Sequence, residues 1–318
     1  MKQIGKFLNL FVYVIFYIFA GESFSSLYNS KTILQQAVII GIAALGMTLV
    51  IISAGIDLSA GSVLAFGTVI TALCLRSQMD GETMGFFIPL AAACLGILAC
   101  AFCGFLNGIM ISGFRIVPFI VTLGMMQIAR GVAKWLASNT TVNVPDSWVG
   151  NLMIVEPNIG AWWSIAPGVW VMLILLGVTF VMLRYTTFGR HIYAVGSNED
   201  TARLCGIQVG MHRVWVYTLC SALVGVASVM QFSSLNLGDP TGGIAFELDV
   251  IAAVVIGGGS FSGGVGSVVG SIIGALIIAI LRNGCNAVEV ENYVQNIVIG
   301  AIIIIAVGID QLKHKKTA

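Results

Sequence analysis

The sequence predicts an all-α membrane protein, a polytopic bundle of about ten membrane-spanning helices. Charged residues make up only 9% of the 318 residues and apolar residues 58%, and the mean hydropathy is +0.99. A soluble domain would carry roughly a quarter charged residues. The apolar residues are gathered in runs, and a helix needs about 20 such residues to cross the hydrocarbon core of a bilayer.

Ten apolar segments meet or approach this length, and they form one predicted transmembrane domain, residues 1–318. Its halves, 1–183 and 214–318, are joined by the polar segment 184–213. The first span resembles a signal peptide, but the sequence around Ala20 is a poor cleavage site, so we expect a retained helix. The predicted spans are 7–21, 34–54, 59–75, 86–111, 117–138, 166–183, 214–236, 248–259, 265–282 and 293–309.

Lys and Arg residues predict the orientation of the bundle, because they accumulate in cytoplasmic loops. Segments 139–165 and 236–247 contain acidic residues but neither Lys nor Arg, so we expect them outside. An even number of spans then leaves both termini in the cytoplasm. The basic residues expected inside are Lys2, Lys6, Arg184, Arg190, Arg203, Arg213, Lys313, Lys315 and Lys316.

The stretch from Ser197 to Gly206, within the central polar segment, predicts a short surface helix. Ser197 is the expected N-cap with Asp200 in the capping-box position, and Gly206 is expected to end the helix. Glu199 and Arg203 are spaced to form an i, i+4 ion pair. About two turns are too short to be stable alone in water, so the helix needs a surface to dock on. The alternative is a solvated connector between spans.

Two glycine-rich helix breaks are predicted at corresponding points of the two halves. The first, from Gly55 to Ser62, includes Asp57, Ser59 and Gly61, and the second runs from Gly257 to Gly264. Irregular backbone at membrane depth is tolerated only against protein or a wet cavity, so paired breaks indicate a solute pathway. Compositional bias toward glycine is the alternative. The candidate pathway residues are Asp57, Ser59, Gly61, Ser62, Asp249, Gly257, Gly258 and Ser260.

Arginines occur near the ends of two predicted spans and inside a third. Each break is followed by Gly-Ser-Val and a helix predicted to end in arginine, Arg76 in one half and Arg282 in the other. Arg130 lies inside a predicted span. It is expected either to serve a pathway or ion pair, or to extend its side chain to the membrane interface.

Several classes of function are disfavoured. None of the seven lysines completes a nucleotide-binding G-x-x-x-x-G-K-[ST] loop, and no metalloprotease or nucleophile-elbow motif occurs, so we expect no enzyme and no cofactor. The seven cysteines and three histidines show no metal-ligand spacing. A net charge of +1 offers no basic surface for nucleic acid. No carboxylate is expected at mid-membrane, which disfavours a proton-coupled carrier.

Three stretches together resemble the membrane permease subunits of bacterial ABC importers for monosaccharides, the ribose-permease family. They are Gly46 to Ser62, Tyr193 to Glu199 with Leu204 to Ile207, and Glu247 to Gly258. The likeness extends from about residue 30 to the C-terminus. It has mild departures, since the family usually has valine at the position of Ala60 and glycine at that of Ser197.

The resemblance implies a fold like that of the cobalamin permease, in the bacterial inner membrane, with two permease subunits as a homodimer or heterodimer. It also implies a cytoplasmic ATPase, which binds the ATP, and a periplasmic or lipid-anchored sugar-binding protein. Arg76 and Arg282 are candidates for docking that protein, with interface anchoring as the alternative. The implied ATPase-coupling residues are Ser197, Asn198, Glu199, Asp200, Arg203, Leu204 and Gly206.

Two other functions stay open on the sequence alone. Branched-chain amino acid permeases share the general hydropathy, and a self-sufficient carrier or channel would need neither ATPase nor binding protein. The sequence does not identify the transported sugar.

Overall fold

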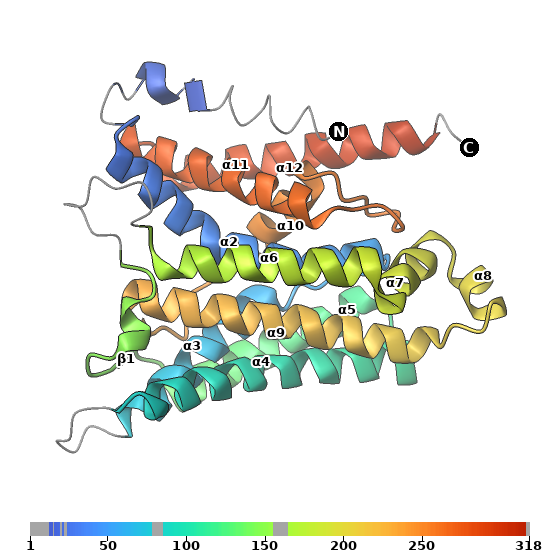
Figure 1. Cartoon of the computed structure of the whole chain (residues 1–318), viewed down its shortest axis with the longest axis horizontal. Helices are drawn as coiled ribbons and strands as arrows, with labels where there is room; N and C mark the ends of the chain where they lie inside the picture. The colour runs from blue at the N-terminus through green and yellow to red at the C-terminus, as the bar shows by residue number, and fades with distance from the viewer. Residues whose placement is uncertain are drawn as a thin grey trace.

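The computed structural model describes residues 13, 14, 16–19, 21, 24–77, 85–154 and 165–315. Most of the predicted first span, 7–21, lies outside the described residues. The described part is a bundle of α-helices with one two-stranded β pair at one end (Figure 1).

The first half of the described chain contains five helices of 17 to 27 residues. The β pair joins the halves, because β1 (Val142–Asn143) pairs antiparallel with β2 (Leu237–Gly238). A short 3-10 turn covers Trp148–Asn151. The helices are α2 (Leu27–Ile52), α3 (Ala60–Arg76), α4 (Phe87–Gly113), α5 (Pro118–Leu136) and α6 (Pro167–Tyr185).

The second half begins after two helices of the central polar segment. These are α7 (Thr187–Ser197) and α8 (Glu199–Leu204), followed by α9 (Val209–Leu235), α10 (Phe246–Ile256), α11 (Val268–Ala287) and α12 (Asn292–Lys315). Arg282 does not end its helix as predicted, because α11 continues to Ala287. Among the described residues, α2, α4, α6, α9 and α11 are long and apolar enough to cross a membrane.

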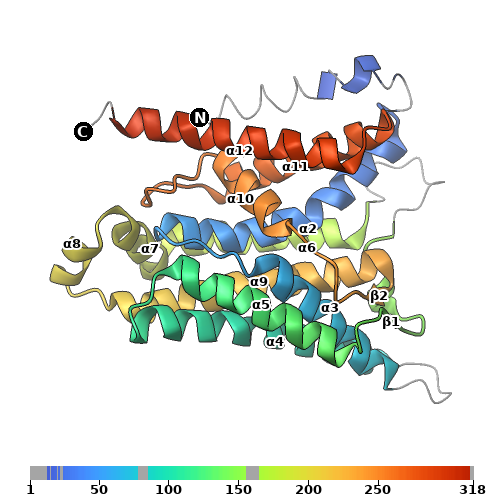
Figure 2. The ribbon, with the colours of Figure 1, turned by 180° about the vertical axis from the view of Figure 1, so that it is seen from behind.

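Small residues let the helices approach closely. On α4, a Cβ atom added at Gly104 would lie 2.3 Å from the carbonyl oxygen of Tyr217 on α9. On α11, a Cβ atom at Gly274 would lie 1.9 Å from the carbonyl oxygen of Ala253 on α10. The short α10 packs against α2, α11 and α12 near the middle of the bundle (Figure 2).

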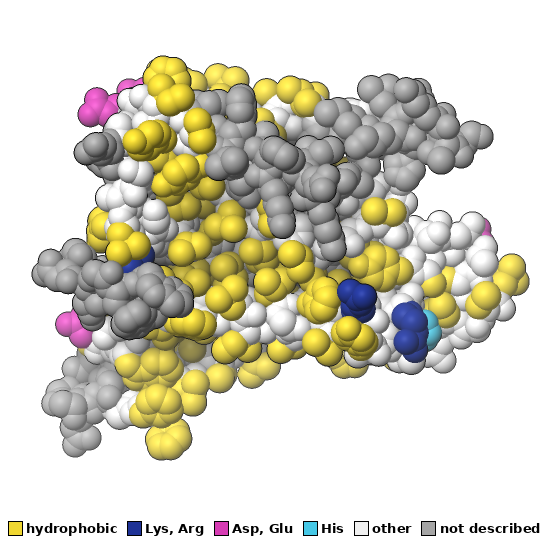
Figure 3. Space-filling model, turned by 45° about the horizontal axis from the view of Figure 1, so that its top comes forward, with side chains coloured by type: hydrophobic (Ala, Val, Ile, Leu, Met, Phe, Trp, Pro, Cys, Tyr) yellow, Lys and Arg dark blue, Asp and Glu magenta, His cyan; other side chains and the backbone are white. Residues whose placement is uncertain are grey.

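The two ends of the bundle carry different segments. Helices α7 and α8 and the end of α12 lie at one end, whereas β1, β2 and the start of α4 lie at the other (Figures 1 and 2). Hydrophobic side chains cover the middle of the face in Figure 3, and most of its visible charged side chains lie toward the ends. This distribution is typical of a protein whose middle faces lipid. The described part of the chain is thus a helical membrane protein.

Candidate functional site

Helix α8 forms where the short surface helix was predicted, but Ser197 is not its N-cap. Ser197 is the last residue of α7, and Asn198 caps α8 by accepting a hydrogen bond from the Thr201 amide at 2.8 Å. Asn198 has the extended conformation that an N-cap requires, with φ −159° and ψ 108°. Moving the cap by one residue also removes Asp200 from the capping-box position.

The end of α8 is the predicted one. Gly206 has φ +82°, the left-handed conformation that glycine adopts without strain. Its amide donates to the carbonyl of Arg203 at 2.9 Å, and the amide of Ile207 donates to that of Ala202 at 3.1 Å. These two bonds satisfy carbonyls that the helix end would otherwise leave free.

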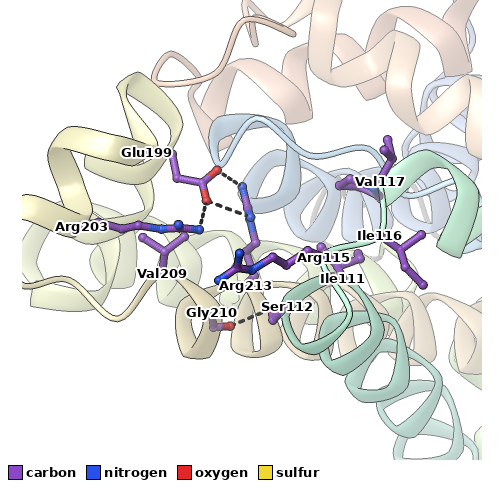
Figure 4. A pocket seen from close by; sticks show the side chains of 11 residues that line it. Ile111, Ser112, Arg115, Ile116, Val117, Glu199, Arg203, Val209, Gly210 and Arg213 are labelled. Carbon is purple, nitrogen blue, oxygen red and sulfur yellow. Dashed lines mark hydrogen bonds and ion pairs between the residues drawn. The ribbon is translucent and has the colours of Figure 1, made fainter.

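Glu199 joins α8 to α9. It pairs with Arg203 at 2.6 Å, as the i, i+4 spacing predicts. Its carboxylate also accepts two hydrogen bonds from Arg213 in the first turns of α9, one of 3.2 Å and one shorter (Figure 4). An ion pair near the surface contributes less than about 1 kcal/mol to the free energy of folding. The two hydrogen bonds from Arg213 therefore add little stability, and their main effect is to fix the position of α8.

Helix α8 has one buried and one exposed side. Ala202 is buried against Val195 and Val209. Leu204 and Cys205 are both exposed, and Leu204 is 89% exposed. With six residues, the helix buries only the side chain of Ala202.

The two helix breaks are non-helical and contact each other. The first covers residues 53–59 and the second 257–267. The amide of Gly264 donates a hydrogen bond to the carbonyl of Ile52 at 2.8 Å. The end of α7 packs onto the same point, since a Cβ atom at Gly196 would lie 1.7 Å from the Ile52 oxygen and 2.7 Å from the Gly264 nitrogen. The Tyr193 hydroxyl on α7 donates to the Gly266 carbonyl at 3.0 Å.

We call this meeting of residues 52–54, 193–197 and 263–266 the junction. Its contacts are largely between main-chain atoms and leave no room for side chains at Gly196. Helix α8 follows α7 after a single residue, so α8 is connected directly to the junction.

The candidate pathway residues of the first half are buried. Asp57 has no exposed surface, and its Oδ1 accepts bonds from the Ser59 amide at 2.9 Å and the Ser59 hydroxyl at 2.6 Å. Asn107 on α4 donates to the Ser59 hydroxyl at 3.2 Å. Gly61 and Ser62 form the first turn of α3 rather than part of the break. A Cβ atom at Gly61 would lie 2.2 Å from the Gly243 carbonyl oxygen.

The candidate residues of the second half surround the start and end of α10. Asp249 pairs with Arg282 of α11 at 2.6 Å. Gly257 and Gly258 end the helix, where Gly258 has φ +94°. Ser260 is buried, and its hydroxyl accepts from the Ser262 amide at 3.3 Å.

The three arginines discussed in the sequence analysis, Arg76, Arg130 and Arg282, differ in their surroundings. Arg76 is the exposed last residue of α3, whereas Arg282 is partly buried in its pair with Asp249. Arg130 on α5 donates to the carbonyls of Pro240, at 3.1 Å, and Gly242. It therefore holds the segment between β2 and α10, a contact with backbone that the sequence did not indicate.

Comparison with known proteins identifies the family. The family described as "Branched-chain amino acid transport system / permease component" matches residues 29–307. The ribose import permease protein RbsC of Bacillus subtilis (strain 168) is 37% identical over 98% of this chain and 94% of its own length. That of Escherichia coli (strain K12) is 36% identical over 92% of this chain and 88% of its own.

A third relative has a different sugar in its name. The galactose/methyl galactoside import permease protein MglC of Escherichia coli (strain K12) is 32% identical over 99% of this chain and 96% of its own length. No solved structure gives a significant match. The chain therefore belongs to the family of transport-system permease components, together with these sugar import permeases.

Proposed function

We propose that the chain is the transmembrane permease subunit of an ABC importer that moves a monosaccharide, such as a ribose-like sugar, into the cytoplasm. It works in the bacterial inner membrane with about ten spans, both termini inside and a fold like that of the cobalamin permease. A second permease subunit completes the pathway. A cytoplasmic ATPase binds ATP, and a periplasmic or lipid-anchored protein delivers the sugar.

The junction is the observation that carries this proposal. An importer without its own nucleotide-binding loop needs a contact that transmits the state of a partner to its helices, because coupling requires a structural element with two arrangements. Helix α8 is held by Asn198 and Glu199, and α7 links it to both helix breaks through Gly196. ATP-driven movement of α8 thereby changes the packing at Ile52 and Gly264.

The exposed side of α8 suits a protein partner. Leu204, 89% exposed, lies at the end of the helix, and Asn198 and Asp200 are exposed on the same short element. An apolar side chain surrounded by polar ones is typical of a small docking contact. We assign this face to the ATPase.

Monosaccharide import is favoured over branched-chain amino acid import by the names of the relatives, which are ribose and galactose/methyl galactoside import permeases. The alternative keeps support from the description of the matched family.

Reconstituted vesicles test the proposal. They would contain the chain, its ATPase and its binding protein, and uptake of labelled ribose, galactose and leucine would be measured with and without ATP. We expect sugar uptake only when all three proteins and ATP are present. Uptake of leucine would favour the amino acid function, and uptake by the chain alone would establish a self-sufficient carrier.

A further inference from the structure

A basic hollow lies between α8, the start of α9 and the connection from α4 to α5. Its volume is about 390 Å³. Three arginines line it, Arg115 from the connection, Arg203 from α8 and Arg213 from α9, with Glu199 as the one acidic residue (Figure 4).

The charges in this hollow are not balanced. Glu199 is shared between Arg203 and Arg213, so one carboxylate faces two guanidinium groups. Arg115 adds a third, and within the described part of the chain it forms no hydrogen bond or ion pair with a side chain. Its side chain extends toward Arg213 in Figure 4. Like charges brought together without counter-charge repel each other, and a bound anion relieves that repulsion.

Apolar side chains stand next to this hollow. Ile111, Ile116, Val117 and Pro118 form part of its wall. On the two neighbouring helix ends, Phe114 is 74% exposed, Met211 55% and Trp215 52%. Tryptophan beside exposed apolar residues is typical of the level at which lipid headgroups meet the hydrocarbon core. The ligand therefore combines a negative charge with an apolar portion.

We propose that this hollow binds the phosphate group of an anionic membrane phospholipid, with the acyl chains lying against the ends of α4 and α9. Basic pockets between membrane helices bind such headgroups, and guanidinium groups match phosphate geometry with paired hydrogen bonds. Arg115 and the free donors of Arg203 and Arg213 hold the phosphate. The lipid thereby fills the space between α8 and the α4–α5 connection. The inference does not depend on the nature of the transported solute.

The purified chain alone tests the site, with phosphatidylglycerol as the probe and phosphatidylcholine as the neutral comparison. Native mass spectrometry measures how many lipids stay bound, and thermal unfolding measures stabilisation. We expect the wild type to prefer phosphatidylglycerol. The Arg115→Gln substitution should weaken that preference about fivefold, which corresponds to the loss of one cation near an anionic surface, and Arg115→Lys should retain most of it.

Arg76→Gln is the matched control, because Arg76 is exposed at the opposite end of the bundle. It should leave the preference unchanged. Equal preference in wild type and Arg115→Gln overturns the proposal, as does an equal loss in Arg76→Gln. Stabilisation by inorganic phosphate alone, equal to that by phosphatidylglycerol, would overturn the lipid assignment. A further outcome would also overturn it: no preference for phosphatidylglycerol, together with less ATPase co-purifying with Arg115→Gln than with the wild type. The hollow would then bind an acidic part of the ATPase.

Discussion

The space next to the Cα atom of Gly196 is too small for even a methyl group. The atom that a Cβ would meet first is a backbone oxygen, which cannot rotate away as a flexible side chain can. We predict that Gly196→Ala lowers the free energy of unfolding by about 1 to 3 kcal/mol, because a helix must shift to admit the methyl group. The midpoint of thermal unfolding in detergent measures this.

Gly177→Ala is the control, since Gly177 lies in α6 and a methyl group added there would have nothing within 4 Å. This change should stabilise the chain slightly, by up to about 1 kcal/mol, through helix propensity. Equal unfolding midpoints for the two variants would contradict the tight packing at the junction.

Arg76 offers a test of docking by the binding protein. We predict that Arg76→Glu weakens the affinity of the sugar-loaded binding protein several-fold, and that the loss shrinks as salt rises, because exposed charges are screened. Surface plasmon resonance at two salt concentrations measures it. Arg184→Glu, a charge reversal at the opposite end, should have no effect. If the binding protein bound Arg76→Glu as tightly as the wild type, the docking role would be excluded and only anchoring at the membrane interface would remain. Arg282→Glu is less informative, because it also breaks the pair with Asp249.

Local sequence rules predicted some contacts of these residues and missed others. The Glu199–Arg203 pair follows from i, i+4 spacing, which a helix imposes whatever surrounds it. Arg213 is 14 residues from Glu199, and only the turn after α8 brings it back. Ser197 and Asn198 are both good capping residues, so the choice between them depends on where α7 ends, which the local rules did not predict.

At the scale of elements, the ion pairs of Glu199 hold α8 on one side, and the packing of Ala202 holds it on the other. We predict that Glu199→Lys abolishes stimulation of the ATPase by sugar-loaded binding protein while the membrane bundle stays folded, because three basic residues then meet without an acid. The Glu199→Arg, Arg203→Glu double variant should recover little, since Arg213 would face the new arginine.

ATPase activity and uptake in reconstituted vesicles measure this coupling, and the thermal unfolding midpoint controls for folding. Cys205→Ser, at an exposed neighbouring position, is the matched neutral substitution. If Glu199→Lys and the double variant both transport at the wild-type rate, the segment is a solvated connector.

The positions of the helices along the chain were predicted better than the contacts between them. Nine of the ten predicted spans have a helix in the structure, with ends shifted by several residues, and the first span lies largely outside the described residues. Glycine content located both breaks because it lowers helix propensity. The hydrogen bond between Gly264 and Ile52 joins residues more than two hundred positions apart, and no periodicity encodes such a pairing.

At the scale of the whole molecule, the charge distribution predicts which end faces the cytoplasm. Residues 151 and 198 are both exposed. Residue 151 ends the 3-10 turn that follows β1, and residue 198 lies between α7 and α8, which are at the end of the bundle opposite β1 (Figure 1). In a variant lacking all seven cysteines, we expect an impermeant thiol reagent added to sealed cells to label a cysteine at 151 and to leave one at 198 unlabelled. Permeabilised cells, in which both positions should react, serve as the control. Labelling of 198 in sealed cells would reverse the orientation.

Apolar length and composition sufficed to predict a helical membrane protein, because the bilayer imposes them on any spanning helix. They did not determine how the helices are arranged. Packing depends on where small residues of distant helices meet, as Gly104 meets Tyr217 and Gly274 meets Ala253. The likeness to the cobalamin permease and the count of ten spans stay predictions.

The position of α2 has a consequence for synthesis. This helix is buried between α9 and α11, and its Thr48 hydroxyl shares a hydrogen bond of 2.6 Å with Ser271, 223 residues later in the chain. At a translation rate of about 5 to 20 residues per second, roughly 10 to 45 seconds pass before that partner is made. During this interval the hydroxyl of Thr48 can donate to the carbonyl of Ala44 in its own helix, so α2 can enter the membrane with this group satisfied and exchange hydrogen bonds with Ser271 only when synthesis is nearly complete.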